Sequence, residues 1–269
     1  MRLTRGLLYT IALLTGLTCP AQGWGAVAFG AIGAGAGQVN SINVAYPTGI
    51  ASGNLLFLCI ANKYPPNGPA TPTGFTAPAN NQGTGDPGDG PGIGVGATYA
   101  TVYYRVADGS ESGTVTVSVT SGNALYGVMA RYTNATGAWA VGAANGGDST
   151  AGTAWSATMG TDPGVQGGDM VLACNANNNN TSLGSAYALS QTGVTYGTAT
   201  ERLDNSTSFG DDVGIKFADH AVTSGTSSAA PVHTWTASAS AAGGTALLRI
   251  RESGTSTNHA AYRRRSGTP

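Results

Sequence analysis

The amino-acid sequence predicts an all-β protein: a jelly-roll-like antiparallel β-sandwich of about eight strands, built from two pseudo-repeated halves. Three observations lead to this prediction. Glycine accounts for 42 of the 269 residues and only 9% of residues are charged, against about 25% in an ordinary soluble domain. Valine, isoleucine, leucine and aromatic residues stand in short alternating runs between Gly-, Pro- and Asn-rich stretches, which is typical of short strands joined by turns. Finally, segments of the first half of the chain recur in the second half in the same order.

The duplication is clearest in two strand segments. Residues 53–62 read GNLLFLCIAN and residues 168–177 read GDMVLACNAN, with Cys59 opposite Cys174. An apolar run of this length after a turn glycine predicts a central strand that is buried on both faces, or on one face and under a subunit contact.

The similarity continues downstream of these strands. The aligned segments are 104–108 with 215–219, TVTVSVT at 114–120 with HTWTASA at 233–239, and 127–131 with 246–249. Both halves therefore run in the order apolar strand, long polar loop, charged strand, turn, alternating strand, glycine-containing turn and closing strand. About four strands per half suit one sandwich of two facing sheets, because four strands alone would leave an apolar face exposed.

The two ends of the chain differ from its middle. Residues 1–30 form a signal-like apolar segment, in which Arg2 and Arg5 precede an apolar run and small residues follow it. The alternative is an N-terminal arm that docks on a neighbouring subunit. The apolar run is shorter than the roughly 20 residues that cross a bilayer, so we expect no stable membrane span. The sandwich is assigned to residues 31–252, with halves at about 40–140 and 141–252, and residues 253–269 to a basic flexible tail.

The strand segments resemble a domain that recurs in structural proteins of tailed bacteriophages. The matching residues are Gly53–Ile60, Pro72–Thr76, Tyr103–Ala107, Glu111, Thr114–Thr120 and Gly127–Tyr132. The resemblance covers residues 40–252 and implies a β-sandwich on a phage particle, as a capsid decoration, a head fibre or a tail-associated protein. The export-like N-terminus departs from this pattern because virion proteins normally assemble in the cytoplasm. That departure leaves a secreted relative as the alternative.

Few residues stand in a pattern that carries chemistry. His220, His233 and His259 have no metal-ligand spacing to a cysteine or to one another, and we assign His233 to the surface of its strand. The acidic residues of TGDPGDGPG and FGDDVG have oxygen ligands of the kind that calcium takes, but Asp-Gly and Asp-Pro are ordinary turn sequences. The sequence therefore predicts no enzyme, no cofactor and no metal site.

Cys59 and Cys174 allow two interpretations. The pseudo-symmetry could bring their strands together, and an oxidising compartment would then permit a disulfide. The other interpretation, which we favour on sequence grounds, is a pair of buried free thiols that pack as small apolar residues.

The charge pattern points to assembly. The net charge is -1 and the only lysines are Lys63 and Lys216, so the chain lacks the basic surface of a nucleic-acid-binding protein. A charge-poor surface favours association, and we expect a homo-oligomer, with a trimer as the first guess.

The candidate contacts with a partner or a surface glycan are aromatic and basic. They are Tyr64 and Phe75 in the long loop 64–96, Trp155, and Arg263, Arg264 and Arg265 in the tail. The leading hypothesis is a non-enzymatic phage virion structural protein, at the virion surface, that decorates or stabilises the capsid or tail through subunit contacts. The alternative is a secreted bacterial carbohydrate-binding or adhesive β-sandwich protein.

Overall fold

The computed structural model describes residues 27–63, 68–85, 97–120, 122, 124–179, 184, 187–210 and 212–254. These residues form antiparallel strands and no helix, which confirms the predicted all-β sandwich. The strands number fifteen in the described residues, more than the sequence predicted, because several outer strands are short. The predicted leader and basic tail lie outside the described residues.

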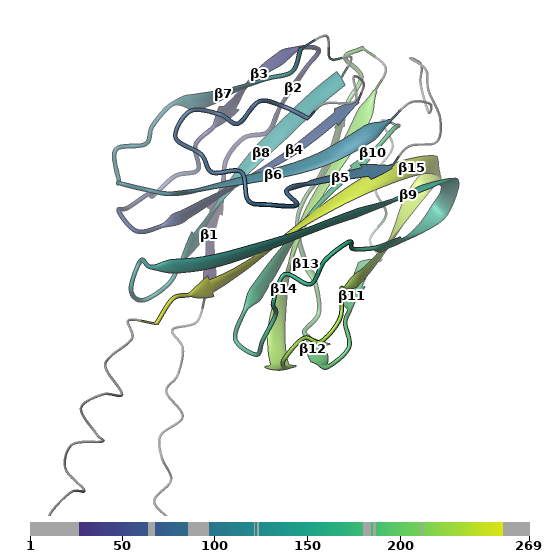
Figure 1. The fold of residues 1–269 in the computed structure, drawn as a ribbon. Helices are drawn as coiled ribbons and strands as arrows, with labels where there is room; N and C mark the ends of the chain where they lie inside the picture. The colour runs from purple at the N-terminus through teal and green to yellow at the C-terminus, as the bar shows by residue number, and fades with distance from the viewer. Residues whose placement is uncertain are drawn as a thin grey trace, which may run out of the picture.

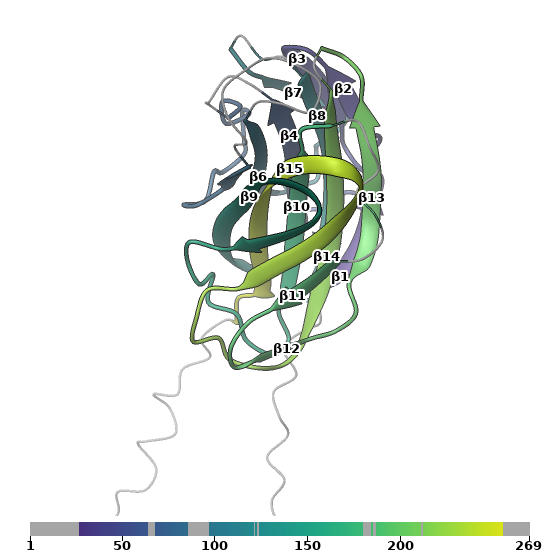
Figure 2. The ribbon, with the colours of Figure 1, turned by 90° about the vertical axis from the view of Figure 1, so that its right-hand side faces the viewer.

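Each half of the chain builds one sheet of the sandwich (Figures 1 and 2). The first sheet contains β1 (Ala28–Ile32), β2 (Ala36–Gln38), β4 (Leu55–Lys63), β5 (Gln82–Gly85), β6 (Thr98–Val106) and β8 (Ala124–Thr133), in the order β1-β8-β4-β6-β5 with β2 also on β8. A small sheet of β3 (Ser41–Ala45) and β7 (Thr114–Ser118) belongs to the same half.

The second sheet is formed entirely by the second half. It contains β9 (Trp139–Thr158), β10 (Met170–Asn177), β11 (Tyr187–Ser190), β12 (Val194–Tyr196), β13 (Thr200–Thr207), β14 (Val213–Gly225) and β15 (Val232–Glu252). The main order is β11-β15-β10-β14-β12, with β9 on β15 and β13 on β14. β9 and β15 are long curved strands that run side by side (Figure 1). The first described strand begins, and the last ends, at the same end of the molecule (Figure 1).

The buried apolar residues form three layers. The central core lies between the two sheets and includes Leu55, Phe57, Cys59, Leu172 and Cys174. The first outer core lies between the first sheet and β3–β7, and the second outer core lies where β9 and β15 bend over the second sheet. Along β4, Leu55, Phe57 and Cys59 enter the central core, whereas Leu56, Leu58 and Ile60 enter the first outer core. The prediction that this strand is buried on both faces is therefore confirmed.

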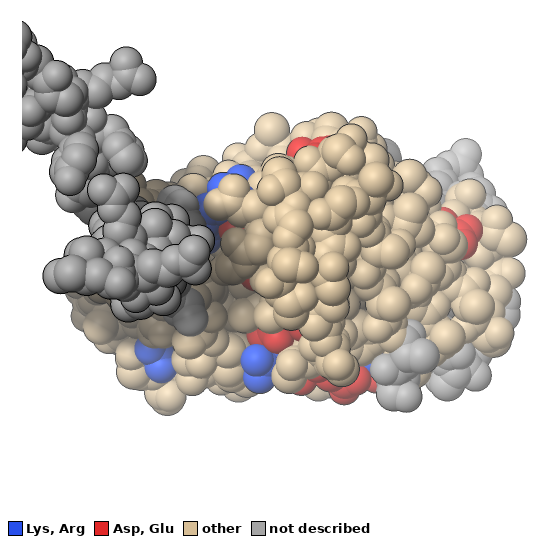
Figure 3. Space-filling view, turned by 90° about the horizontal axis from the view of Figure 1, so that it is seen from below, with Lys and Arg blue, Asp and Glu red and all other residues tan. Residues whose placement is uncertain are grey.

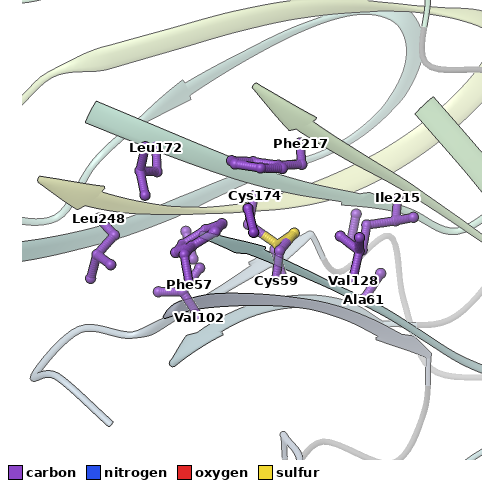
Figure 4. Packing of buried hydrophobic residues seen from close by; sticks show 14 of the residues in the cluster. Phe57, Cys59, Ala61, Val102, Val128, Leu172, Cys174, Ile215, Phe217 and Leu248 are labelled. Carbon is purple, nitrogen blue, oxygen red and sulfur yellow. A yellow bond between two sulfur atoms is a disulfide. The ribbon is translucent and has the colours of Figure 1, made fainter. Parts of the chain in front are cut away.

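A disulfide joins the two halves through the central core. Cys59 on β4 is bonded to Cys174 on β10, and both residues are fully buried. Figure 4 shows the bond among Phe57, Val102, Phe217 and their neighbours. The preference for free thiols was wrong, because the repeat places the two cysteines on equivalent strands of facing sheets, where their side chains meet.

Strand register corrects the sequence alignment of the repeat. Cys59 pairs with Val102, and Cys174 pairs with Phe217. Val102 and Phe217 are therefore equivalent positions, whereas the sequence alignment had placed Phe217 opposite Val106. On the closing strands Cys59 pairs with Val128 and Cys174 with Ala246. Val128 and Ala246 are therefore equivalent, and the same number of residues before each of them stand Val115 and His233. Both of these side chains are buried. The assignment of His233 to the surface was therefore wrong.

The glycine-containing turn expected before the last strand is also absent from the described chain. β15 passes through Ala241–Gly244 without a break, so one strand replaces the pair β7 and β8 of the first half. By the same comparison β9 replaces β1, β2 and β3, because its two ends pair with the two ends of β15. The long loop 64–96, expected to have little strand, contains β5.

A charged contact ties the halves together at one edge. The Asp219 carboxylate accepts hydrogen bonds from the Tyr132 hydroxyl (3.0 Å) and from Arg202 Nε (2.7 Å). The Arg202 guanidinium also lies 3.9 Å above the centre of the Phe29 ring. Burial, and then the Asp219 charge, raises the pKa of Tyr132 well above its ordinary value, so its hydroxyl stays protonated as the donor. This contact joins strands of both sheets.

Candidate functional site

The two outer cores differ in chemistry although they occupy equivalent places. In the first, Ile42 pairs with Val117 and Val44 with Val115. In the second, Trp155 pairs with Trp235 and Ala157 with His233. Val115 and Val117 of the first half thus correspond to His233 and Trp235 of the second, and Ile42 corresponds to Trp155. This difference marks the second outer core as the place to look for a site.

The rings of the second outer core form a continuous cluster. The Trp155 and Trp235 ring centres lie 4.9 Å apart with planes at 80°, and His233 lies 5.0 Å from Trp235 at a tilt of 30°. His220 contacts His233 edge to face at 5.9 Å and is flanked by Tyr187 at 5.8 Å. Edge-to-face contacts of this kind add stability beyond the area they bury.

Several polar atoms in this cluster have no hydrogen-bond partner within the described part of the chain. They are Nε1 of Trp235, Nε2 of His220, and both ring nitrogens of His233. Burial lowers the pKa of His220 to about 4 and that of His233 to about 3, so both imidazoles are neutral at neutral pH. An unsatisfied buried polar atom costs about 1–3 kcal/mol, so a cluster of them calls for a functional explanation.

A cavity of about 600 Å³ opens beside this cluster. Its walls come from β9, β11, β13, β15 and the segment before β13, and include Trp155, Tyr187, Glu201, Thr234, Trp235 and Thr236. A volume of this size is in the range of small-molecule sites. Aromatic rings with a few hydroxyls and one carboxylate are also the usual lining of such sites. We call this cavity the second-half pocket.

A buried ammonium group supports one wall of the pocket. The Lys216 Nζ atom lies 3.0 Å from a Glu201 carboxylate oxygen and 3.7 Å from an Asp204 oxygen. It also donates a hydrogen bond to the Gly184 carbonyl oxygen, and it sits 4.9 Å from the centre of the Tyr187 ring. Two carboxylates thus face one ammonium, and Glu201 is the one charged side chain among the described residues that line the pocket. Burial, followed by the Glu201 charge, raises the pKa of Tyr187 to about 12, which keeps its hydroxyl protonated.

The residues that the sequence predicted as partner or glycan contacts do not lie together in the structure. Trp155 lines the second-half pocket with its side chain 2% exposed. Phe75 is buried in the first outer core, where it covers the aliphatic cluster. The backbone turns before it at Gly74, with a φ of 82°, and the Phe75 amide donates to the Pro72 carbonyl oxygen at 3.0 Å. Tyr64, Arg263, Arg264 and Arg265 lie outside the described residues.

Sequence reasoning missed Tyr187, Glu201 and Trp235. The signal that would have found Trp235 is the repeat in its correct register, where Trp235 stands opposite Val117. Tyr187 and Glu201 have no such signal, because β11 and β13 lie outside the segments that the duplication aligns.

The described residues contain no group of three or more His, Cys, Asp or Glu side chains placed to hold a metal ion. Of the two acidic loops considered for calcium, the TGDPGDGPG segment lies largely outside the described residues, and Asp212 in the other has a φ of 63°. No helix in the described part of the chain is long and apolar enough to cross a membrane. The face in Figure 3 carries only scattered charged side chains.

Comparisons with protein-family models, with curated proteins and with solved structures found no match to this chain.

Proposed function

We propose that this chain is a non-enzymatic protein that is exported and works outside the cytoplasm by binding, through the second half of the sandwich. The observation that carries the proposal is the buried disulfide between Cys59 and Cys174. Disulfides persist in oxidising compartments and are rare in the cytoplasm. The bond lies in the central core between the two sheets. The signal-like segment at the N-terminus leads to the same compartment.

The state of the imidazoles supports binding over acid–base catalysis. A general acid or base works best when its pKa lies near the working pH. Burial lowers the pKa of His220 to about 4 and that of His233 to about 3, which makes both rings weak bases at neutral pH. Their ring contacts with Trp235 and Tyr187 instead hold the floor of the pocket in place. This fits a secreted carbohydrate-binding or adhesive protein.

The second candidate is a virion structural protein that decorates a capsid or tail as a homo-oligomer. The observation that favours it is the resemblance to tailed-phage structural proteins, whose matching residues lie between Gly53 and Tyr132. The duplicated segments 53–62 and 168–177 contribute β4 and β10, which lie in the centre of their sheets. The charge-poor surface supports assembly with copies of itself or with other particle proteins. In this function the trimer remains part of the proposal.

One experiment separates the two candidates. The full chain with its own leader is produced in a bacterium that has a periplasm, and the mass of the recovered protein is measured after alkylation in denaturant without reductant. Export predicts cleavage near Ala26 and no alkylation of Cys59 or Cys174. An intact Met1 with both thiols alkylated would reject export and favour assembly in the cytoplasm. The virion candidate further predicts stoichiometric amounts of the chain on purified particles.

A further inference from the structure

We infer that Lys216 and Asp204 form a covalent amide cross-link between β14 and β13, with Glu201 as the group that carries the protons. The inference concerns a modification within the chain, so it goes beyond the proposed function and does not depend on export. It rests on three observations: the burial of the Lys216 amine, the two carboxylates that face it, and the uncharged pair that occupies the equivalent place in the first half.

Strand register places the amine and the carboxyl group side by side. Asp204 and Lys216 are directly opposite partners in the antiparallel pair of β13 and β14, and side chains in such a pair lie on the same face of the sheet. The Lys216 Nζ atom is 3.7 Å from an Asp204 carboxylate oxygen and 3.0 Å from a Glu201 oxygen. Bond formation therefore needs movement of side chains only, with no change of strand pairing.

The surroundings of the amine favour its reaction. The Lys216 side chain has no exposed surface, and its Nζ atom lies 4.9 Å from the centre of the Tyr187 ring. A buried ion pair is costly because water no longer solvates its two charges. Amide formation removes the charges of Lys216 and Asp204 together, and the Asp204 side chain is only 16% exposed. The fixed contact also replaces a bimolecular encounter, which accelerates reactions between groups held in place.

The first half shows that a neutral pair is enough to fill this place in the fold. By the strand register described above, Thr101 of β6 is equivalent to Lys216 of β14. Their partners on the next strand outward are Gln82 of β5 and Asp204 of β13. Gln82 Nε2 donates a hydrogen bond to the Thr101 hydroxyl at 3.2 Å. The second half instead places a buried amine and two carboxylates there, and a cross-link explains this difference.

The reaction balances without an oxidant, a reductant or a further reactant. Glu201 takes one proton from the Lys216 ammonium, and the neutral amine attacks the carboxyl carbon of Asp204. The bond from that carbon to one of its oxygens breaks. This oxygen leaves as water with the proton from Glu201 and a second proton from the nitrogen, so the amide keeps one N–H and Glu201 is again a carboxylate. Glu201 lines the second-half pocket and is 41% exposed, which gives the water a way out.

Mass spectrometry of the purified full chain tests the cross-link directly. After reduction of the disulfide, we expect the intact protein to be lighter than its mature sequence by one water molecule. Trypsin cuts after lysine and arginine, and the cross-link blocks the cut after Lys216 because that amine is no longer charged. We therefore expect one peptide, 203–249, lighter by one water, in place of the two peptides 203–216 and 217–249.

Variants assign the roles of the two carboxylates. We expect Asp204→Ala to keep its full mass. Asp204→Asn should still react, but it releases ammonia in place of water and so ends at the same mass as the cross-linked unaltered chain. Glu201→Gln lacks the proton carrier and should form the cross-link about a hundredfold more slowly. Asp108→Asn is the matched control, because Asp108 pairs with Arg105 on the exposed surface of the first half, and we expect its cross-link to be complete.

A full mass and free cleavage after Lys216 in the unaltered chain would overturn the inference, and this result does not depend on the folding of any variant. A chain that lacks one water but is still cut after Lys216 would overturn it too, since cyclisation of an aspartate to a succinimide also releases water. So would a blocked cut after Lys216 in Asp204→Ala. The measurement is made on purified protein, so its failure is distinct from a failure of export or of binding.

Discussion

His233 shows how a single residue can be misplaced by sequence reasoning. The segment HTWTASA places His233 on the same face as Trp235 and opposite Thr234 and Thr236, but an imidazole is polar and the sequence does not show what covers that face. The pairing of β15 with β9 sets that face and turns His233 inward, with no exposed surface. Register between distant strands therefore decides whether this imidazole is a surface group or a core group.

The burial of His220 and His233 predicts a pH-dependent stability. In the unfolded chain both imidazoles take up a proton near pH 6.5, whereas in the folded protein they do so only near pH 4 and pH 3. Between those limits the unfolded state binds more protons, so the free energy of unfolding falls as the pH is lowered from about 6.5. Each imidazole contributes up to about 1.4 kcal/mol per pH unit.

Urea unfolding at several pH values between 7 and 4.5 measures this slope. We expect His233→Gln to unfold with a shallower pH dependence than the unaltered chain, since it loses one of the two titrating groups. Equal slopes for the two proteins would show that His233 is not buried as a neutral ring.

At the scale of elements, glycine has two different roles in this chain. Gly53 and Gly168 adopt φ values of 84° and 90° at the start of the equivalent strands β4 and β10, where the sequence predicted turn glycines. Gly147, Gly243 and Gly244 instead lie inside β9 and β15, where β5 crosses them. There the missing side chain lets two backbones approach closely. The sequence alone does not distinguish a glycine in this role from a glycine in a turn.

The crossing of β5 over β9 predicts a position-specific effect of added methyl groups. A Cβ on Gly147 would clash with the Thr84 carbonyl oxygen, whereas a Cβ on Gly152, in the same strand, would lie 3.5 Å from its nearest neighbour, the Ala154 carbonyl oxygen. Gly147→Ala should therefore destabilise the protein by about 1–3 kcal/mol or more. Gly152→Ala should stay within about 0.5 kcal/mol. Thermal melting of both variants measures the difference in stability. Equal melting temperatures would contradict the close crossing of β5 over β9.

The strands themselves were predictable to different degrees. β4, β7 and β10 have strong apolar runs or Val/Thr alternation, and the sequence predicted each of them. β9 and β15 were not predicted as continuous strands of 20 and 21 residues, because their middle sections are rich in Gly, Ala and Ser. Those sections pair with each other only in part, with register shifts on both sides of Ala241, and β5 lies against both strands.

For the whole molecule, the disulfide is the covalent link between the two halves. Its cysteines are separated by 115 residues, and closing a loop of about 100 residues restricts the unfolded chain by an amount worth between about 2 and 5 kcal/mol. We expect the double variant Cys59→Ala/Cys174→Ala to unfold at lower guanidinium concentration than the unaltered chain. Reductant should destabilise the unaltered chain and leave the double variant unchanged. A chain whose unfolding is insensitive to reductant would not contain this bond.

By itself, the sequence determined the all-β class, the duplication and the strands buried on both faces, because these depend on composition, turn residues and local alternation. Only the tertiary structure decided that Cys59 meets Cys174, that each half forms its own sheet, and that Trp155, Tyr187, Glu201 and Trp235 surround one pocket. These features depend on the register and curvature of strands far apart in the chain, and local sequence carries no record of either. The second half of the duplication therefore became a candidate site only once its core could be compared, position by position, with that of the first.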